Sequence, residues 1–93
     1  MIADELTYMI ADSLGFRPTD EQLAAMRTFS SFMTDRSDRV LMIMRGSAGT
    51  GKTSVAGAMV RTMRRLGCKV VLMAPTGRAA KVFALNAGHA ACT

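Results

Sequence analysis

The chain has 93 residues, of which 49% are hydrophobic and 20% are charged, a composition typical of one small globular domain or part of one. Its longest apolar runs, such as Val40–Met44 and Val70–Ala74, are far shorter than the roughly 18 to 20 residues that a membrane-spanning helix requires. The N-terminus carries acidic residues and lacks the basic start and apolar core of a secretory signal. We therefore expect a cytoplasmic protein that does not associate with membranes.

The net charge of +5 is unevenly distributed along the chain. All seven Asp and Glu residues precede position 40, so residues 1–39 are acidic on balance. The basic residues that follow have no carboxylate side chain to oppose them: Arg45, Lys52, Arg61, Arg64, Arg65, Lys69, Arg78 and Lys81. Such an asymmetry favours polyanionic partners, so nucleotide phosphates or nucleic acid are the expected ligands of the second half.

The cysteine and histidine residues do not indicate a metal site. Cys68 and Cys92 lack the spacing of a metal-binding motif, and an intracellular chain normally keeps such cysteines as thiols. His89 has no cluster of Cys, Asp or Glu residues near it in the sequence. We therefore assign no metal role to these three residues.

Two helices are predicted in the acidic part of the chain. Apolar residues recur at helical spacing over Ile2–Leu14, and Gly15 follows where a helix would end. A second helix is predicted from about Asp20 to Met33, preceded by Thr19, a residue type that caps helix N-termini. Residues 1–39 are thus predicted to form an N-terminal helical segment.

Residues 40–93 are predicted to alternate between strands and helices. The segments Val40–Met44 and Val70–Ala74 are apolar at consecutive positions, as in strands that helices cover on both faces. Helices are predicted over Lys52–Leu66 and from Arg78 to about Leu85. The order strand, helix, strand, helix predicts an α/β fold with a parallel sheet.

A phosphate-binding pattern lies between the first predicted strand and the helix after it. The residues that match G-x-x-x-x-G-K-[ST] are Gly46, Ser47, Ala48, Gly49, Thr50, Gly51, Lys52 and Thr53. Glycines let successive backbone N–H groups point at phosphate oxygens, and the helix N-terminus adds the positive end of its dipole. A chance match in 93 residues has a probability of roughly a few in a thousand, so we disfavour a plain glycine-rich turn.

Two residues of this pattern have predicted chemical roles. We expect Lys52 to bridge the β- and γ-phosphates of the nucleotide, which makes it the predicted catalytic residue. We expect the Thr53 hydroxyl to ligate the Mg²⁺ that the nucleotide carries. The predicted site is therefore that of a P-loop NTPase.

Two flanking segments narrow the class of P-loop protein. Thr19, Glu21 and Gln22 precede the loop, and the sequence PTGRAA at Pro75–Ala80 follows the second predicted strand. Together with the phosphate loop, these segments resemble the superfamily 1B DNA helicases, the group that contains RecD-like and Dda-like enzymes. The resemblance begins at about Phe16 and implies the N-terminal part of a RecA-like motor domain, with an incomplete parallel sheet and flanking helices.

The resemblance implies an adenine contact upstream of the loop. In that family the glutamine of the upstream motif reads the base of ATP, which implies this role for Gln22. Thr19 and Gln22 also have the spacing of a capping box, in which the glutamine side chain returns to the backbone of the cap residue. The two roles can coexist.

The resemblance also implies a contact with single-stranded DNA. In the family the downstream motif touches the DNA, which implies Pro75, Thr76, Gly77 and Arg78 for this contact. A threonine hydroxyl, N–H groups at a helix start and an arginine suit a backbone phosphate. The alternative is a helix-initiating turn with solvated basic side chains. For Arg61, Arg64 and Arg65 we favour a solvated position on the outer face of their helix, suited to its C-terminal end.

The carboxylates that hydrolysis requires are missing from the second half of the chain. Such motors use an acidic pair after a later strand and an arginine finger, whereas no Asp or Glu follows Asp38. These 93 residues are therefore expected to bind ATP and Mg²⁺ without hydrolysing ATP. We expect them to be the N-terminal part of a longer helicase, whose remainder would be their partner together with single-stranded DNA.

Two other readings of the sequence remain. One is a P-loop nucleotide-binding protein without motor activity, such as a small kinase or a regulatory ATPase. The other is a basic nucleic-acid-binding module without enzymatic activity, which the intact phosphate loop disfavours. In the helicase reading, the two predicted strands are not neighbours in the sheet, so their unpaired backbone groups and apolar faces are expected to be open to water.

Overall fold

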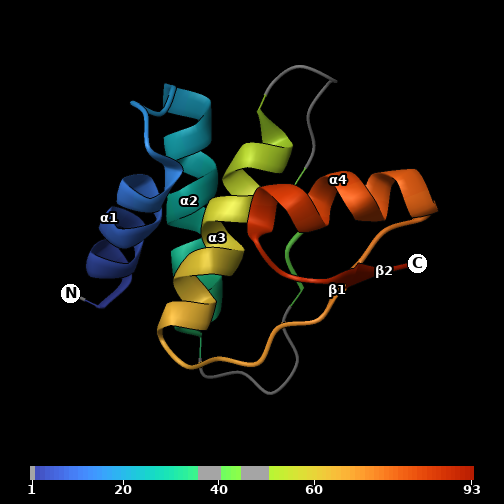
Figure 1. Cartoon of the computed structure of the whole chain (residues 1–93). Coiled ribbons are helices and arrows are strands. Elements are labelled where there is room, and N and C mark those ends of the chain that lie inside the picture. Colours follow the sequence, from blue (N-terminus) through green and yellow to red (C-terminus); the bar gives the residue numbers. More distant parts are fainter. Residues whose placement is uncertain (1, 36–40, 45–50) are drawn as a thin grey trace.

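The computed structural model describes residues 2–35, 41–44 and 51–93. In chain order the elements are α1 (Ile2–Leu14), α2 (Asp20–Met33), α3 (Lys52–Arg65), β1 (Leu72–Met73), α4 (Gly77–Ala87) and β2 (Ala91–Cys92). Figure 1 shows α3 between the pair α1 and α2 on one side and α4 with the strands on the other. No helix of these three described ranges is long and apolar enough to cross a bilayer.

All four predicted helices are present, and their bounds are close to those expected. The first two match the predicted ranges, whereas α3 ends one residue earlier, at Arg65, and α4 extends to Ala87. A capping box starts α2, because the Thr19 hydroxyl accepts a hydrogen bond from the Gln22 backbone and the Gln22 side chain accepts one from the Thr19 backbone. Thr76 caps α4, its hydroxyl accepting a bond from the backbone N–H of Ala79 at 3.1 Å.

The main hydrophobic core lies between α1, α2 and α3. Its buried side chains come from the apolar stripes that predicted these helices: Leu6, Ile10, Leu14, Met26, Val55, Ala58, Met59 and Met63. One polar pair is buried within it, because the Thr7 hydroxyl donates to Ser30 Oγ at 2.7 Å and Ser30 donates to the Met26 carbonyl at 2.9 Å. The N-terminal helices and the helix that follows the phosphate loop therefore share one core, and a division at residue 39 stays a prediction.

The sheet is smaller than predicted. β1 and β2 pair in parallel, with Leu72 opposite Ala91 and Met73 opposite Cys92, and the backbone N–H of Ala74 donates to the Cys92 carbonyl at 2.8 Å. The strand predicted over Val70–Ala74 is thus reduced to its centre, and β2 was not predicted. Together, β1, α4 and β2 form a unit compatible with an α/β fold whose sheet is incomplete.

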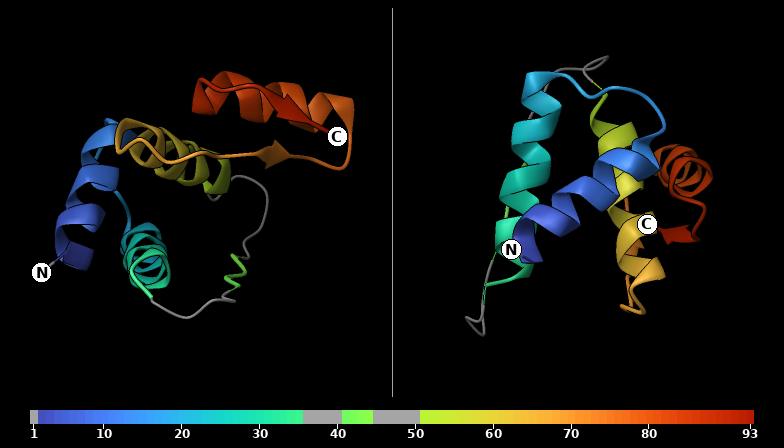
Figure 2. Two further views of the ribbon diagram at one scale, coloured as in Figure 1. Left: turned by 90° about the horizontal axis from the view of Figure 1, so that it is seen from below. Right: turned by 90° about the vertical axis from the view of Figure 1, so that its left-hand side faces the viewer.

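The prediction of a strand over Val40–Met44 is wrong for the four residues of it that the structure describes. Val40 lies outside the described residues, and Leu41–Met44 form no strand. In the left view of Figure 2 this green segment runs apart from β1. A strand requires a neighbour for its backbone groups, and β1 pairs with β2 instead. Apolar side chains of this segment are nevertheless open to water, since Leu41 is 85% exposed and Ile43 is 69% exposed.

Candidate functional site

The start of α3 is the described part of the predicted phosphate site. Gly51 is its N-cap residue, with a left-handed φ of 81° that favours glycine. Its carbonyl accepts the first helical bond from the backbone N–H of Val55 at 3.0 Å, and Gly51 makes no side-chain cap bond there. N–H groups at such a helix start remain available to an anion.

The remaining loop residues are placed only in part. Lys52 is half-buried and Thr53 is exposed in the first turn of α3. The other predicted loop residues lie outside the described part of the chain: Gly46, Ser47, Ala48, Gly49 and Thr50. The described end of the pattern thus has the left-handed glycine, the lysine and the hydroxyl in the order that a phosphate loop requires.

Gln22 lies directly against this helix start. A Cβ atom built on Gly51 would collide with Gln22 Nε2, so the side-chain amide occupies the space beside the glycine. The capping-box role of Gln22 is confirmed by its two bonds with Thr19, at 2.9 and 3.1 Å. The adenine role stays a prediction, and the position of the amide beside Gly51 is compatible with it. Gly51 therefore serves two purposes, since any side chain there would strain the backbone and displace Gln22.

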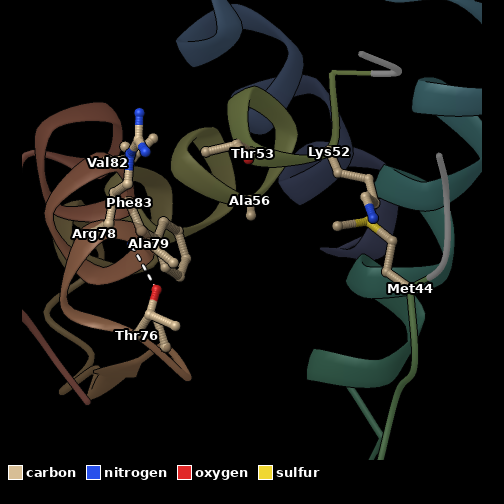
Figure 3. A pocket seen from close by; sticks show the side chains of 10 residues that line it. Met44, Lys52, Thr53, Ala56, Thr76, Arg78, Ala79, Val82 and Phe83 are labelled. Atoms are coloured by element: carbon tan, nitrogen blue, oxygen red, sulfur yellow. Dashed lines mark hydrogen bonds between the residues drawn. The ribbon is translucent and has the colours of Figure 1, made fainter. Parts of the chain in front are cut away.

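A cavity of about 470 Å³ brings the two downstream motifs together. It is lined by Met44, Lys52, Thr53, Ala56, Ala74, Thr76, Arg78, Ala79, Val82 and Phe83. Figure 3 shows α4 on one side of this cavity, Met44 on the other, and the first turns of α3 between them. The end of the phosphate loop and the PTGR turn, 23 positions apart from Thr53 to Thr76 in the numbering, thus face a common space.

The PTGR turn is a helix start. Thr76 uses its hydroxyl as the N-cap of α4, which is the simpler alternative for this residue. Pro75, Gly77 and Arg78 are exposed, and Figure 3 shows Arg78 and Lys52 on opposite sides of the cavity. An exposed arginine at a helix start can bind a phosphate, and the DNA contact stays a prediction for these four residues.

The prediction of a solvated outer face is wrong for Arg61. Its Nε and Nη2 atoms donate to the side chain and carbonyl of Ser13 at 3.1 and 2.9 Å, and Nη1 donates to the Asn86 carbonyl at 2.5 Å. Arg64 Nη1 donates to the Gly88 carbonyl at 3.1 Å. These carbonyls lie at the C-terminal ends of α1 and α4, where a cation is favourable.

Gly57 is a sequence signal for the close approach that Arg61 bridges. Gly57 is buried inside α3, and a Cβ atom there would collide with Asn86 Oδ1. Glycine inside a helix costs about 1 kcal/mol relative to alanine, so it indicates a close approach by another element. His89 likewise has a structural contact, since its Nε2 atom lies 2.9 Å from the Val70 carbonyl.

Comparison with protein families places most of the chain in a known family. Residues 17–93 match the sequence profile of the AAA domain family, a range that includes α2, α3, α4 and both strands. Only α1 among the described elements precedes the matched range. No curated protein and no solved structure matches the chain.

Proposed function

Because the AAA domain match covers residues 17–93, the chain belongs to that family of P-loop nucleotide-binding domains, and we propose that it is the ATP-binding part of a DNA helicase. The observation that carries this proposal is the common cavity of Lys52, Thr53, Thr76 and Arg78. A motor must couple nucleotide binding to its grip on DNA, and two motifs that face one space can be coupled by small movements of α3 against α4.

The chemistry of the site favours a triphosphate with its Mg²⁺ ion. Lys52 supplies a cation and the start of α3 supplies backbone donors, which together suit the β- and γ-phosphates. Mg²⁺ keeps several waters and takes few protein ligands beside phosphate oxygens, so the exposed hydroxyl of Thr53 suits it. When bound, the ion neutralises phosphate charge. The residues of this chain hold and orient the nucleotide.

Hydrolysis requires groups that the cavity lining does not contain. A carboxylate must orient the attacking water in such enzymes, and none of the lining residues is an Asp or Glu. We propose that ATP hydrolysis and DNA translocation depend on carboxylates and an arginine from further polypeptide. The full chain of 93 residues is accordingly expected to bind ATP without turnover.

The proposal is tested by nucleotide titration. Lys52→Ala is expected to weaken binding of an ATP analogue by roughly ten- to a hundredfold, because a charge-assisted contact contributes about 1.5 to 3 kcal/mol. Arg65→Ala is the matched control, since Arg65 is an exposed cation at the other end of α3. Equal affinities for the wild type and Lys52→Ala would contradict the phosphate site.

The helicase part of the proposal requires a separate measurement. We expect the chain to bind a single-stranded oligonucleotide, and we expect Arg78→Gln to weaken this binding and reduce its salt dependence. Lys69→Gln is the control, since Lys69 is exposed and outside the cavity lining of Arg78. ATP binding without any binding of single-stranded DNA would favour a P-loop protein without motor activity.

A further inference from the structure

The outer face of α1 carries an aromatic side chain among carboxylates. Tyr8 is 77% exposed. Asp4, Glu5 and Asp12 stand three or four positions from Tyr8, so they lie on the same face of the helix, and all three are exposed. No Lys or Arg occurs in α1. This surface, which we call the acidic face, therefore presents one aromatic ring within a negative field.

The stability of α1 accounts for only part of the acidic face. Asp4 and Glu5 lie in the first turn of the helix, where a negative charge is favourable. Asp12 lies in the last turn, where a negative charge is unfavourable. The exposed ring of Tyr8 adds nothing to the core that the opposite face of α1 helps to form. The packing of α1 therefore explains neither Tyr8 nor Asp12.

A second cavity of the molecule has the complementary properties. Its volume of about 410 Å³ lies in the range of cavities that take small apolar groups. The cavity reaches the surface at Cys68, Lys69 and Val71, which are all exposed. Lys69 places a positive charge at this opening, and α3 ends in two arginines shortly before it. The larger side chains of its walls are apolar and come from three helices: Phe29, Met33, Met59, Met63 and Phe83.

We propose that Tyr8 of one copy of this chain enters this cavity in a second copy, so that copies associate head to tail. A symmetric contact would bring two acidic faces or two basic openings together, and like charges repel. A head-to-tail contact instead places the carboxylates around Tyr8 against Lys69 of the next copy. Figure 1 shows α1 and β1 on opposite sides of α3, so one chain cannot make this contact with itself. The contact goes beyond the proposed function and does not require nucleotide.

Burial of the ring and attraction of the charges have different roles in this contact. An aromatic side chain removes about 150 to 250 Å² from water when it is buried, and tyrosine is enriched among the residues that dominate interfaces. The Tyr8 hydroxyl can remain at the opening and accept a hydrogen bond from the Lys69 ammonium group. The charges orient the two copies, and salt screens them. Association should therefore increase with protein concentration and weaken as sodium chloride is added.

Sedimentation velocity of the full chain at rising concentration measures the association. Tyr8→Ser removes the ring, and Val71→Asp places a negative charge at the opening of the cavity. We expect each change to weaken association about thirtyfold or more, as for an interface hot spot. Leu85→Ser and Leu85→Asp are the matched controls, since Leu85 is 78% exposed and lines neither of the two cavities. Both controls should associate like the wild type.

A mixture of the two variants separates head-to-tail association from a symmetric contact. The Tyr8→Ser chain keeps an intact cavity, and the Val71→Asp chain keeps its tyrosine. We expect each variant alone to stay monomeric, whereas an equimolar mixture should form a 1:1 complex. This complex should not grow further, because its free ends are the altered tyrosine position and the altered cavity.

Several results would overturn the proposal. They are a wild type that stays monomeric at every concentration, association that strengthens with sodium chloride, and a loss of association in only one of the two variants. A mixture that stays monomeric would also overturn it. Far-UV circular dichroism checks that each variant is folded. If Val71→Asp loses its helical signal, Cys68→Asp replaces it, since Cys68 is exposed at the same opening.

Discussion

The helical layer, formed by α1, α2 and α3, buries a shared apolar core. The strand layer, by which we mean β2 and the non-helical segments Leu41–Met44 and 70–73, the latter including β1, leaves many of its apolar residues exposed. Ile10 and Met26 have no exposed surface, while Val71 and Met73 are 75% and 70% exposed. Helices satisfy their backbone groups within one segment, but a strand depends on its neighbours. The difference shows that the candidate nucleotide site has a packed helical core on one side and an incomplete sheet on the other.

An apolar cavity of about 410 Å³ lies between the two layers. Its lining includes Phe29 and Met33 from α2, Met59 and Met63 from α3, and Val70 from the approach to β1. Side chains at such a boundary lose part of the dispersion contacts that a filled core provides. The free energy of folding should therefore come mainly from the helical layer, and substitutions in the two layers test this directly.

The largest expected effect is in the helical layer. Met26→Ala should lower the free energy of unfolding by about 2 to 5 kcal/mol, because it opens a cavity in a fully buried position. Met33→Ala is the matched control on the same helix, since Met33 is 38% exposed. Urea denaturation followed by circular dichroism gives both values. Equal losses for the two variants would contradict the burial of Met26 in the core of the helical layer.

The structure of the helical layer is also the part of the fold that the sequence predicts best. The stripe Leu6, Ile10 and Leu14 recurs at helical spacing and is buried as that spacing implies. Thr19 and Gln22 predicted a capping box that the structure contains. Such features depend on residues within one or two turns, so local sequence determines them.

The sequence predicts the strand layer and the long-range contacts less well. Apolar runs cannot reveal which strands lie side by side, so the pairing of β1 with β2 was missed and Leu41–Met44 was wrongly predicted as a strand. In the candidate site, the pattern identified Lys52 and Thr53, but the distance between this loop and Thr76 depends on how α4 packs on α3. That packing is a tertiary property.

A second prediction concerns the bridge that Arg61 makes from the helical layer to α4. Arg61→Met should lower the free energy of unfolding by about 1.5 to 3 kcal/mol, because it removes charge-assisted bonds to Ser13 and Asn86 and keeps the aliphatic volume. Arg65→Met is the control, since Arg65 is exposed on the same helix, and it should change stability by less than about 0.5 kcal/mol. Thermal melts of the two variants provide the comparison. Similar melting temperatures would contradict a bridging role for Arg61.

The smallest effect is expected in the strand layer. Ile43→Thr should change the free energy of unfolding by less than about 0.5 kcal/mol, because a side chain that is 69% exposed loses little buried area when it is shortened. Ile10→Thr makes the same chemical change at a position with no exposed surface, where an added hydroxyl and a lost methyl group are both unfavourable. Denaturant titrations of the pair thus compare one substitution in two environments. If Ile43→Thr costs as much as Ile10→Thr, then Leu41–Met44 packs in solution against another surface, and the contrast between the layers does not hold.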